Sequence, residues 1–263
     1  MGVIRLFAAA VAGLTATGAQ AADIAARPYT KTPVAPVVSY NWTGCYAGGN
    51  IGGGWHRVEQ NANSNVAGVP FVPPLAFGSS DGSAVIGGVQ VGCDYQFAGN
   101  WVIGVQGMFD FGDINSSNTS SDTRLTPIGV FQQTYTRDVY TGTARLGYLL
   151  TPQVLGYVKG GGAWTRVGTE VFGTVPFFFL SETAHSNRAG WTVGGGLEWM
   201  FAPNWSVFVE YNYMDFGRAN IAFANAPNVF GIPTLNETRL TLQTALVGVN
   251  YKFNWGGPVV AKY

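Results

Sequence analysis

A strict alternation of apolar and other side chains constrains this chain more than any other feature. In WMFAPNWSVFVEYNYMDFG, residues 199–217, apolar side chains occupy every second position on both sides of a short Ala-Pro-Asn break. Successive side chains of a β-strand point to opposite faces, so this period predicts two strands joined by a tight turn. The largest rings stand at the ends of each apolar row, with smaller residues between them. The sequence therefore predicts a β-hairpin whose apolar face has aromatic margins.

Breaks of similar chemistry start at Ala98, Thr151 and Ala202, and so recur at a nearly constant interval. Each unit holds two alternating segments separated by a longer polar stretch, and extending the pattern in both directions predicts eight strands. We expect strands at 42–57, 84–97, 101–111, 134–150, 154–169, 188–201, 205–216 and 239–253. The long polar loops are expected at 58–83, 112–133, 170–187 and 217–238. Short turns alternating with long loops are typical of outer-membrane barrels, in which the short turns face the periplasm.

The first residues indicate export. Residues 1–21 have a basic start, an apolar stretch and an Ala-Gln-Ala cleavage site, as a secretory signal peptide does. A membrane anchor is the alternative, but the run is short for a spanning helix. We expect a Pro/Ala-rich periplasmic linker at 22–41, the barrel at 42–253 and a C-terminal tail at 254–263.

One face of the predicted strands is apolar and has aromatic residues at both ends. A lipid-facing band is about 25 Å tall and bounded by two aromatic girdles, and about ten tilted residues span it. A soluble barrel with this face inward is the alternative, but it would crowd bulky rings into a narrow core. The predicted girdle residues are Trp42, Trp55, Trp101, Trp164, Trp191, Trp199, Trp205, Tyr251 and Phe253.

The opposite face carries ionisable side chains of both signs. The predicted lumen charge network consists of Asp94, Asp110, Arg137, Arg145, Lys159, Glu198, Glu210 and Lys252. Buried charges need partners, and the interior of eight strands is just wide enough for side chains to fill. This favours a structural plug over an ion pathway. Inward glycines, such as Gly92 and Gly104, leave some room for water and keep the pathway as an alternative.

Charge and cysteine content limit the partners. Only 11% of the 263 residues are charged, the formal net charge is zero and there is no basic run, so a nucleic-acid partner is not expected. Cys45 and Cys93 fall on neighbouring predicted strands near the periplasmic edge. The exported compartment permits a disulfide, but the strand register is too uncertain to decide between a bridge and two thiols.

No catalytic, cofactor or metal site is predicted. Gly78-Ser79-Ser80-Asp81-Gly82 matches G-x-S-x-G by letter, yet it lies in a polar loop rather than between a strand and a helix. Asp110, Asp113 and Asn115 are spaced like calcium ligands, but the rest of such a loop is missing. His185 with Glu182 keeps a lipid-active enzyme as a minor alternative.

Four motifs carry a family resemblance: WTGCYAGGNIGGGW, VGCDYQFAGNWVIGVQGMFDF, GWTVGGGLEWMFAPNWSVFVEYNYMDFG and VGVNYKF. They resemble the small outer-membrane proteins of alphaproteobacteria, within the wider group of barrels similar to the OmpA transmembrane domain. The resemblance spans residues 42–253. It implies an all-β, eight-stranded, antiparallel up-and-down transmembrane barrel in the outer membrane of a Gram-negative bacterium, with surface exposure and a role in envelope integrity. Proteins of this family often carry a porin-like label, and the resemblance implies no catalytic residues.

The expected partners follow from this location. They are outer-membrane lipids and lipopolysaccharide, the barrel-assembly machinery and periplasmic chaperones, and a host or extracellular ligand at the loops. One departure is that barrels usually end on the terminal aromatic, whereas a tail follows Phe253. A structural and surface role is the main hypothesis, and a narrow channel or an adhesin are its alternatives.

Overall fold

The computed structural model describes residues 40–65, 70–119, 129–175, 178–222 and 233–253. The predicted signal peptide, nearly all of the predicted linker and the tail at 254–263 lie outside the described residues. Among the residues that the structure describes, no helix has the length and apolar character needed to cross a membrane.

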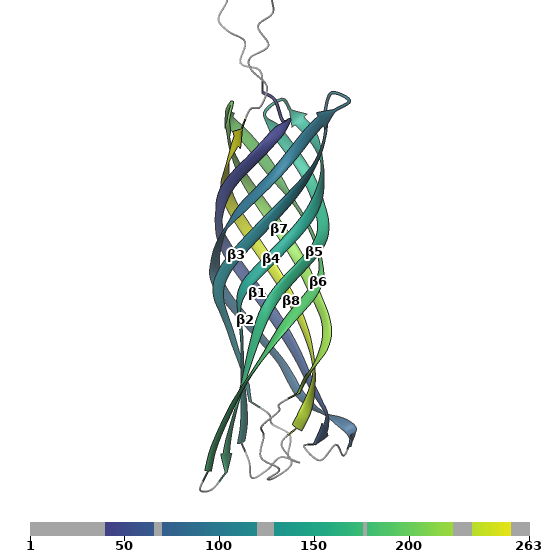
Figure 1. Ribbon diagram of the computed structural model, residues 1–263, viewed down its shortest axis with the longest axis vertical. Helices are drawn as coiled ribbons and strands as arrows, with labels where there is room; N and C mark the ends of the chain where they lie inside the picture. Colours follow the sequence, from purple (N-terminus) through teal and green to yellow (C-terminus); the bar gives the residue numbers. More distant parts are fainter. Residues whose placement is uncertain (1–39, 66–69, 120–128, 176–177, 223–232, 254–263) are drawn as a thin grey trace, which may run out of the picture. The chain divides into compact units, whose positions relative to one another are not determined.

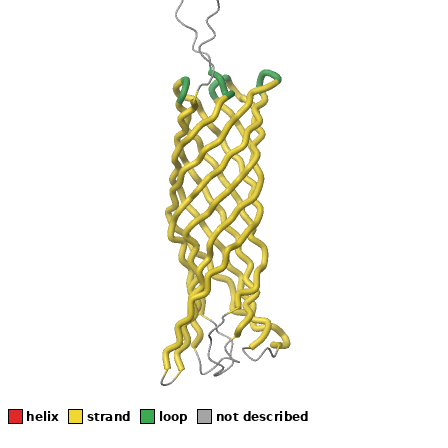
Figure 2. Tube along the Cα trace, viewed as in Figure 1, coloured by secondary structure: helices red, strands yellow, loops and turns green. Residues whose placement is uncertain are grey.

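Eight antiparallel strands close into a ring within the described residues, each paired with its neighbours in sequence (Figures 1 and 2). The ring is closed by β1 and β8, which pair from Cys45 opposite Phe253 to Asn65 opposite Pro233. The predicted up-and-down barrel is confirmed. The strands are β1 (Gly44–Asn65), β2 (Pro70–Phe97), β3 (Trp101–Thr119), β4 (Gly129–Thr151), β5 (Val154–Val175), β6 (Phe178–Ala202), β7 (Trp205–Ala222) and β8 (Pro233–Phe253).

The three short turns have a common role. The carbonyl oxygens of Asn100, Gln153 and Asn204 accept hydrogen bonds from the backbone N–H groups of Leu149, Met200 and Lys252, at 2.8, 2.8 and 2.7 Å. The last residue of each recurring break therefore ties its hairpin to the next one. In the first turn, Ala98 and Gly99 take positive φ angles of 46° and 78°, a conformation that glycine adopts without a steric penalty. The repeat seen in the sequence is thus the repeat of a hairpin connection.

The strands run well past the predicted boundaries. β5 was expected to end at 169 but ends at Val175, and β2 was expected from 84 but starts at Pro70. In these extensions the residues no longer alternate between apolar and polar, as in Pro-Phe-Val-Pro-Pro at the start of β2 and Glu-Val-Phe-Gly-Thr-Val at the end of β5. The period that marks a strand is therefore absent while the backbone ladder continues. All of the predicted loop residues that the structure describes are therefore strand.

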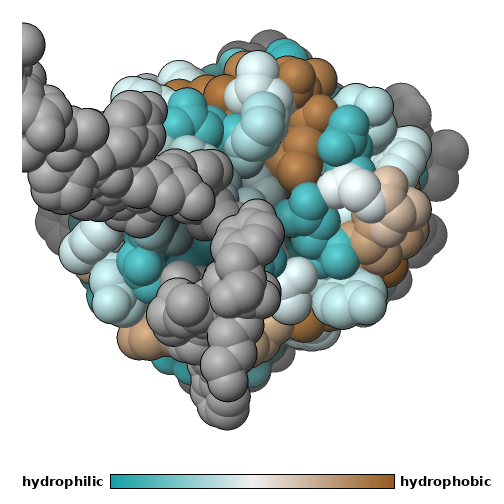
Figure 3. All heavy atoms as spheres, turned by 90° about the horizontal axis from the view of Figure 1, so that it is seen from above, coloured by the Kyte–Doolittle hydropathy of each residue, from teal (hydrophilic) through white to brown (hydrophobic). Residues whose placement is uncertain are grey.

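The outer face carries the predicted aromatic rows. Eight of the nine predicted girdle residues are exposed, by 38–51% of their surface, on the outside of the barrel. Rings of the row near the short turns touch one another: Trp205 lies 5.0 Å from Tyr251, and Tyr251 lies 5.2 Å from Phe253, between centroids. The exposed aliphatic side chains between the rows include Val193, Leu197, Val209, Val247 and Val249. Viewed from the short-turn end, hydrophobic residues appear around the rim with hydrophilic ones between them (Figure 3).

Side chains from facing strands fill the interior in layers. Near the short turns lies an apolar cluster of Trp42, Val102, Leu149, Leu155, Tyr157 and Met200. The polar and charged side chains follow along the strands. A second apolar cluster begins among these polar side chains and continues towards the end opposite the short turns. This cluster, here called the apolar plug, is formed by Val58, Ile86, Met108, Ile114, Val139, Ala163, Val167, Phe208, Met214, Phe216, Leu240, Leu242 and Leu246.

Candidate functional site

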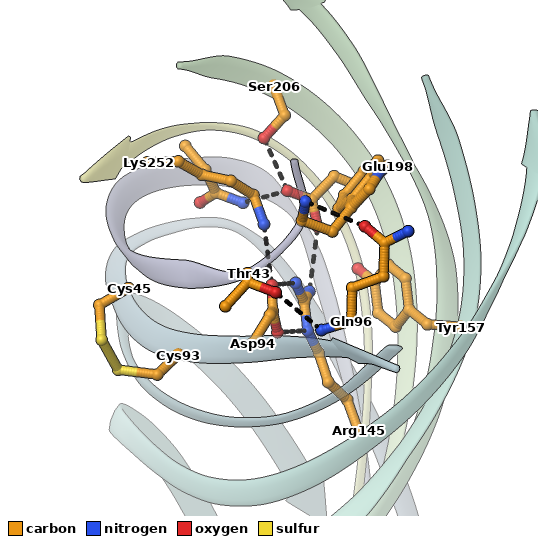
Figure 4. Close-up of polar contacts among 12 residues, drawn as sticks. Thr43, Cys45, Cys93, Asp94, Gln96, Arg145, Tyr157, Glu198, Ser206 and Lys252 are labelled. Atoms are coloured by element: carbon orange, nitrogen blue, oxygen red, sulfur yellow. Dashed lines mark hydrogen bonds and ion pairs between the residues drawn. A yellow bond between two sulfur atoms is a disulfide. The ribbon is translucent and has the colours of Figure 1, made fainter. Parts of the chain in front are cut away.

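The charge network in the lumen is centred on a guanidinium that two carboxylates hold (Figure 4). Arg145 donates from Nε to Oδ1 of Asp94 at 2.7 Å and from Nη2 to the other oxygen of Asp94, while Nη1 reaches Glu198 at 3.0 Å. The rings of Tyr46 and Tyr157 lie 4.9 and 5.1 Å from the guanidinium carbon. All five side chains are buried. Bidentate pairing and ring contacts together fix this cation in one position.

Lys252 completes the inner part of the network. Its Nζ lies 2.8 Å from Oδ2 of Asp94 and 4.6 Å from the centroid of Trp42. Glu198 is further held by Ser206, whose hydroxyl donates to Oε1 at 2.6 Å. These contacts satisfy the buried charges, which would otherwise cost several kcal/mol each.

A second buried ion pair, between Lys159 and Glu210, lies further along the lumen. Lys159 Nζ is 2.6 Å from Glu210 Oε1 and also donates to Gln106 at 3.0 Å. Glu210 accepts from the hydroxyl of Tyr157 at 2.8 Å and from the amide of Asn212 at 2.9 Å. Because Tyr157 also lies beside Arg145, the two charged groups form one continuous assembly.

Asp110 joins the network through amides. Asn50 donates to Asp110 and to Gln90, both at 3.0 Å, and Gln90 donates to Asn250 at 2.8 Å. Asn250 then donates to Glu198 at 3.2 Å. Seven of the eight predicted network residues are therefore placed together, with four carboxylates and three cations among them.

Arg137 does not belong to this set, and its predicted position in the lumen is wrong. Its side chain is 68% exposed on the outer face, and its Nε lies 3.8 Å from Oδ1 of Asp113. The register of β4 against β5 shifts between Thr136 and Asp138, so the inward parity changes there. Counting by twos from Arg145 fails across such a bulge. Asp110 points inward and Asp113 is exposed, so the calcium-like spacing does not bring their carboxylates to one site.

The predicted girdle position of Trp42 is also wrong. The side chain is fully buried in the cluster at the short-turn end, and Nε1 donates to the carbonyl of Pro152 at 3.1 Å. β1 begins only at Gly44, whose φ of 148° suits glycine. Trp42 therefore precedes the strand, and the alternation that would direct it outward does not apply to it.

The inward glycines do not leave the room that the sequence suggested. A Cβ on Gly92 would collide with the ring of Tyr46, and one on Gly104 would collide with the carboxylate of Asp94. At Gly196 the added atom would lie 2.9 Å from the hydroxyl of Tyr157. These glycines are the niches that the large network side chains occupy.

Most of the apolar plug lies further along the strands than the charge network, but the two overlap: Lys159 Nζ lies 3.0 Å from Met108 Sδ, and Phe208 lies between Ser206 and Glu210 on β7. The side chains of the apolar plug come from β1 to β5, β7 and β8, so it extends across the lumen. A cavity of about 10 Å³ among Ile86, Ile114, Val139 and Leu242 is close to the minimum that holds one water. An ion crossing the barrel would have to pass both the paired charges and this apolar layer.

Among the described residues, the sequence argument missed three buried acidic or basic side chains: His56, Asp215 and Arg188. Arg188 of β6 is 4% exposed and lies beyond the outer aromatic row. Burial lowers the pKa of its guanidinium from the ordinary value. The signal was present in the sequence, because Arg188 has the same parity as Thr192 and Glu198, both of which point inward.

The two cysteines lie directly opposite each other on β1 and β2. Cys45 pairs with Cys93 in the register, and a disulfide joins them. Their outward parity, shared with Val91 and Val105, places the bridge on the lipid-facing side. The structure thus favours the bridge of the two alternatives that the sequence left open.

Comparisons with known proteins agree with this architecture. The model of the outer membrane protein beta-barrel domain matches residues 7–253. The 31 kDa outer-membrane immunogenic protein of Brucella melitensis is 30% identical over 254 residues, covering 93% of this chain and 98% of that protein. The 25 kDa outer-membrane immunogenic protein of Brucella abortus is 26% identical, covering 94% and 96%. The crystal structure of OprG from Pseudomonas aeruginosa matches with a TM-score of 0.45 and 15% identity, over 82% of this chain and 99% of that one.

Proposed function

The chain belongs to the outer membrane protein beta-barrel domain family, and from this premise we propose that it is a non-conducting structural component of the envelope that displays its long loops at the cell surface. It is an outer-membrane β-barrel protein. The proposal includes four statements: the role is structural, the lumen is closed, the protein is not a catalyst, and residues 1–21 direct its export.

The filled lumen is the observation that supports this role. Arg145, Lys252 and Lys159 are each held by buried carboxylates, and the apolar plug follows. A permeating ion would have to separate paired charges in a low-dielectric interior, which costs several kcal/mol per ion. It would then meet an apolar constriction, which opposes a continuous water column.

Planar-bilayer recording of the refolded protein tests the proposal. We expect no reproducible conductance steps from the wild-type chain. A variant with Met214→Ala and Leu242→Ala, inserted to the same extent, controls for the effect of thinning the plug. Regular single-channel steps from the wild type would favour the narrow channel and contradict the structural role.

Surface display is supported by the length of the strands. β5 continues from Trp164 in the outer aromatic row to Val175, and β1 continues from Trp55 to Asn65. About ten residues suffice to cross the membrane, so this second half of each strand extends beyond the outer row. The Brucella relatives are known as outer-membrane immunogenic proteins, which is consistent with display.

Antibodies provide the test of display. Serum raised against the refolded barrel should label intact cells, and a strain lacking the gene should lose the label. A loss of resistance to detergent in that strain, restored by the wild-type gene, would support the envelope role. Labelling only after permeabilisation would contradict surface exposure, and unchanged resistance would argue against the envelope role.

A further inference from the structure

Arg188 is a buried cation in the half of the lumen opposite the short turns. It lies on β6, where it pairs with Thr165 of β5, and only 4% of its surface is exposed. Part of the apolar plug lies between it and the charge network, in which the carboxylates already have partners. On β5 its partner Thr165 lies between the plug residues Ala163 and Val167. None of the network contacts extends to Arg188 among the described residues.

Only one nitrogen of this guanidinium donates a hydrogen bond to the residues that the structure describes. Nη1 donates to the backbone carbonyl of Thr238 at 2.8 Å. Nε and Nη2 are buried and have no hydrogen-bond partner in the part of the chain that the structure describes. These two nitrogens form the side-on edge of the guanidinium, whose parallel N–H groups match the two oxygens of a carboxylate or phosphate.

Arg145 shows how this protein satisfies the same edge elsewhere. There, Nε and Nη2 both donate to the carboxylate of Asp94. Around Arg188 the nearby carboxylate Asp215 of β7 is already held by Arg239 at 2.9 Å and by the N–H of Gly217 at 2.8 Å. Arg239 is partly exposed, so this pair belongs to the outer face. Arg188 therefore presents the same pair of donor nitrogens as Arg145, but among the described residues no carboxylate accepts from them as Asp94 does from Arg145.

The surroundings are polar and carry further unsatisfied atoms. Thr238 lies directly opposite Gln60 across the β1–β8 seam. The hydroxyl of Thr238 and Oε1 of Gln60 are both buried without a partner among the described residues. The amide of Gln60 donates to Thr134 at 3.3 Å, and Ser80 donates to Ser116 at 3.2 Å. The hydroxyl of Thr238 is thus a second donor available beside the guanidinium.

We propose that the Nε–Nη2 edge of Arg188 binds an oxyanion group, a carboxylate or a phosphate, of a small solute that enters from the end opposite the short turns. The apolar plug closes the other side, so the solute binds without crossing the barrel. An uncompensated buried charge destabilises the folded protein, and a bound oxyanion would remove that penalty. This site goes beyond the structural role and does not depend on conduction.

Titration calorimetry on the refolded full chain in a detergent without phosphate tests the site. Acetate and inorganic phosphate are added separately at constant ionic strength, so that the two arms distinguish a carboxylate from a phosphate. We expect one of them to bind the wild type and to raise its unfolding midpoint. Arg188→Gln should weaken that binding at least about tenfold, because a charge-assisted bidentate contact is lost.

Arg166→Gln is the matched control, since Arg166 faces outward on β5 opposite Asn187. It should bind the anion as the wild type does. Arg188→Lys keeps the positive charge but lacks the paired N–H groups of the guanidinium. An intermediate affinity of this variant would support side-on recognition even if Arg188→Gln does not fold. No binding to the wild type, or equal binding to Arg188→Gln, would overturn the proposal.

Discussion

At the scale of the residue, the same side chain occurs in two different situations. Arg145 makes three hydrogen bonds and two ring contacts, whereas Arg188 makes one hydrogen bond to the residues that the structure describes. The identity of both residues as inward cations follows from parity. Their pairing does not, because it depends on which distant strands face each other across the lumen.

The first prediction concerns Arg145. Arg145→Ala would leave Asp94 and Glu198 buried with only Lys252 nearby, and removal of one partner from a buried pair costs about 3–5 kcal/mol. Urea unfolding in lipid vesicles measures this loss. Arg137→Ala is the control, since that side chain is exposed and should change the free energy of unfolding by less than about 1 kcal/mol. Equal effects of the two substitutions would contradict the assignment of Arg145 to the lumen.

The second prediction concerns an inward glycine. Gly92→Ala should destabilise the barrel by about 1–3 kcal/mol, because the new methyl group would displace the ring of Tyr46 from the face of Arg145. Gly107→Ala on the outer face would meet only an ordinary contact at 4.0 Å, from the carbonyl of Thr141. The two variants can be compared in the same unfolding experiment. A Gly92→Ala protein as stable as Gly107→Ala would show that the niche is not filled.

At the scale of the element, alternation predicted which face of each strand meets lipid and which meets the lumen. It failed at two kinds of position. Arg137 lies at a bulge, where parity changes without a marker in the sequence, and Trp42 lies before the strand begins. The strand lengths were also underestimated, since a ladder whose residues do not alternate between apolar and polar, such as Glu-Val-Phe-Gly-Thr-Val of β5 beyond 169, lacks the pattern on which the prediction depended.

The β1–β2 hairpin carries the third prediction. The disulfide between Cys45 and Cys93 closes a segment of 48 residues, and such a constraint on the unfolded chain contributes about 2–4 kcal/mol. Reductant should therefore lower the unfolding midpoint of the wild type and leave a Cys45→Ala, Cys93→Ala double variant unchanged. Mass spectrometry after alkylation measures the thiols directly. Alkylation of both residues without reductant would contradict the bridge.

At the scale of the whole molecule, the eight-stranded arrangement could be predicted because each short break repeats one turn and each strand repeats one pattern. Closure of the lumen could not. It depends on the fit of Tyr46 against Gly92 and of Phe208 against Gly248, which come from different strands. Such complementarity across the barrel leaves no local pattern in the chain.

The fourth prediction follows from two closures in series. The charge network around Arg145 and the apolar plug around Met214 and Leu242 each obstruct the same path. Arg145→Ala alone should not conduct, because the plug remains; Met214→Ala with Leu242→Ala alone should not conduct, because the paired charges remain. The triple variant should give reproducible steps in planar bilayers, provided that heat-dependent gel migration shows it folded to the same extent. Conduction by either partial variant would mean that one layer alone closes the barrel, and a silent, folded triple variant would mean that other side chains close it.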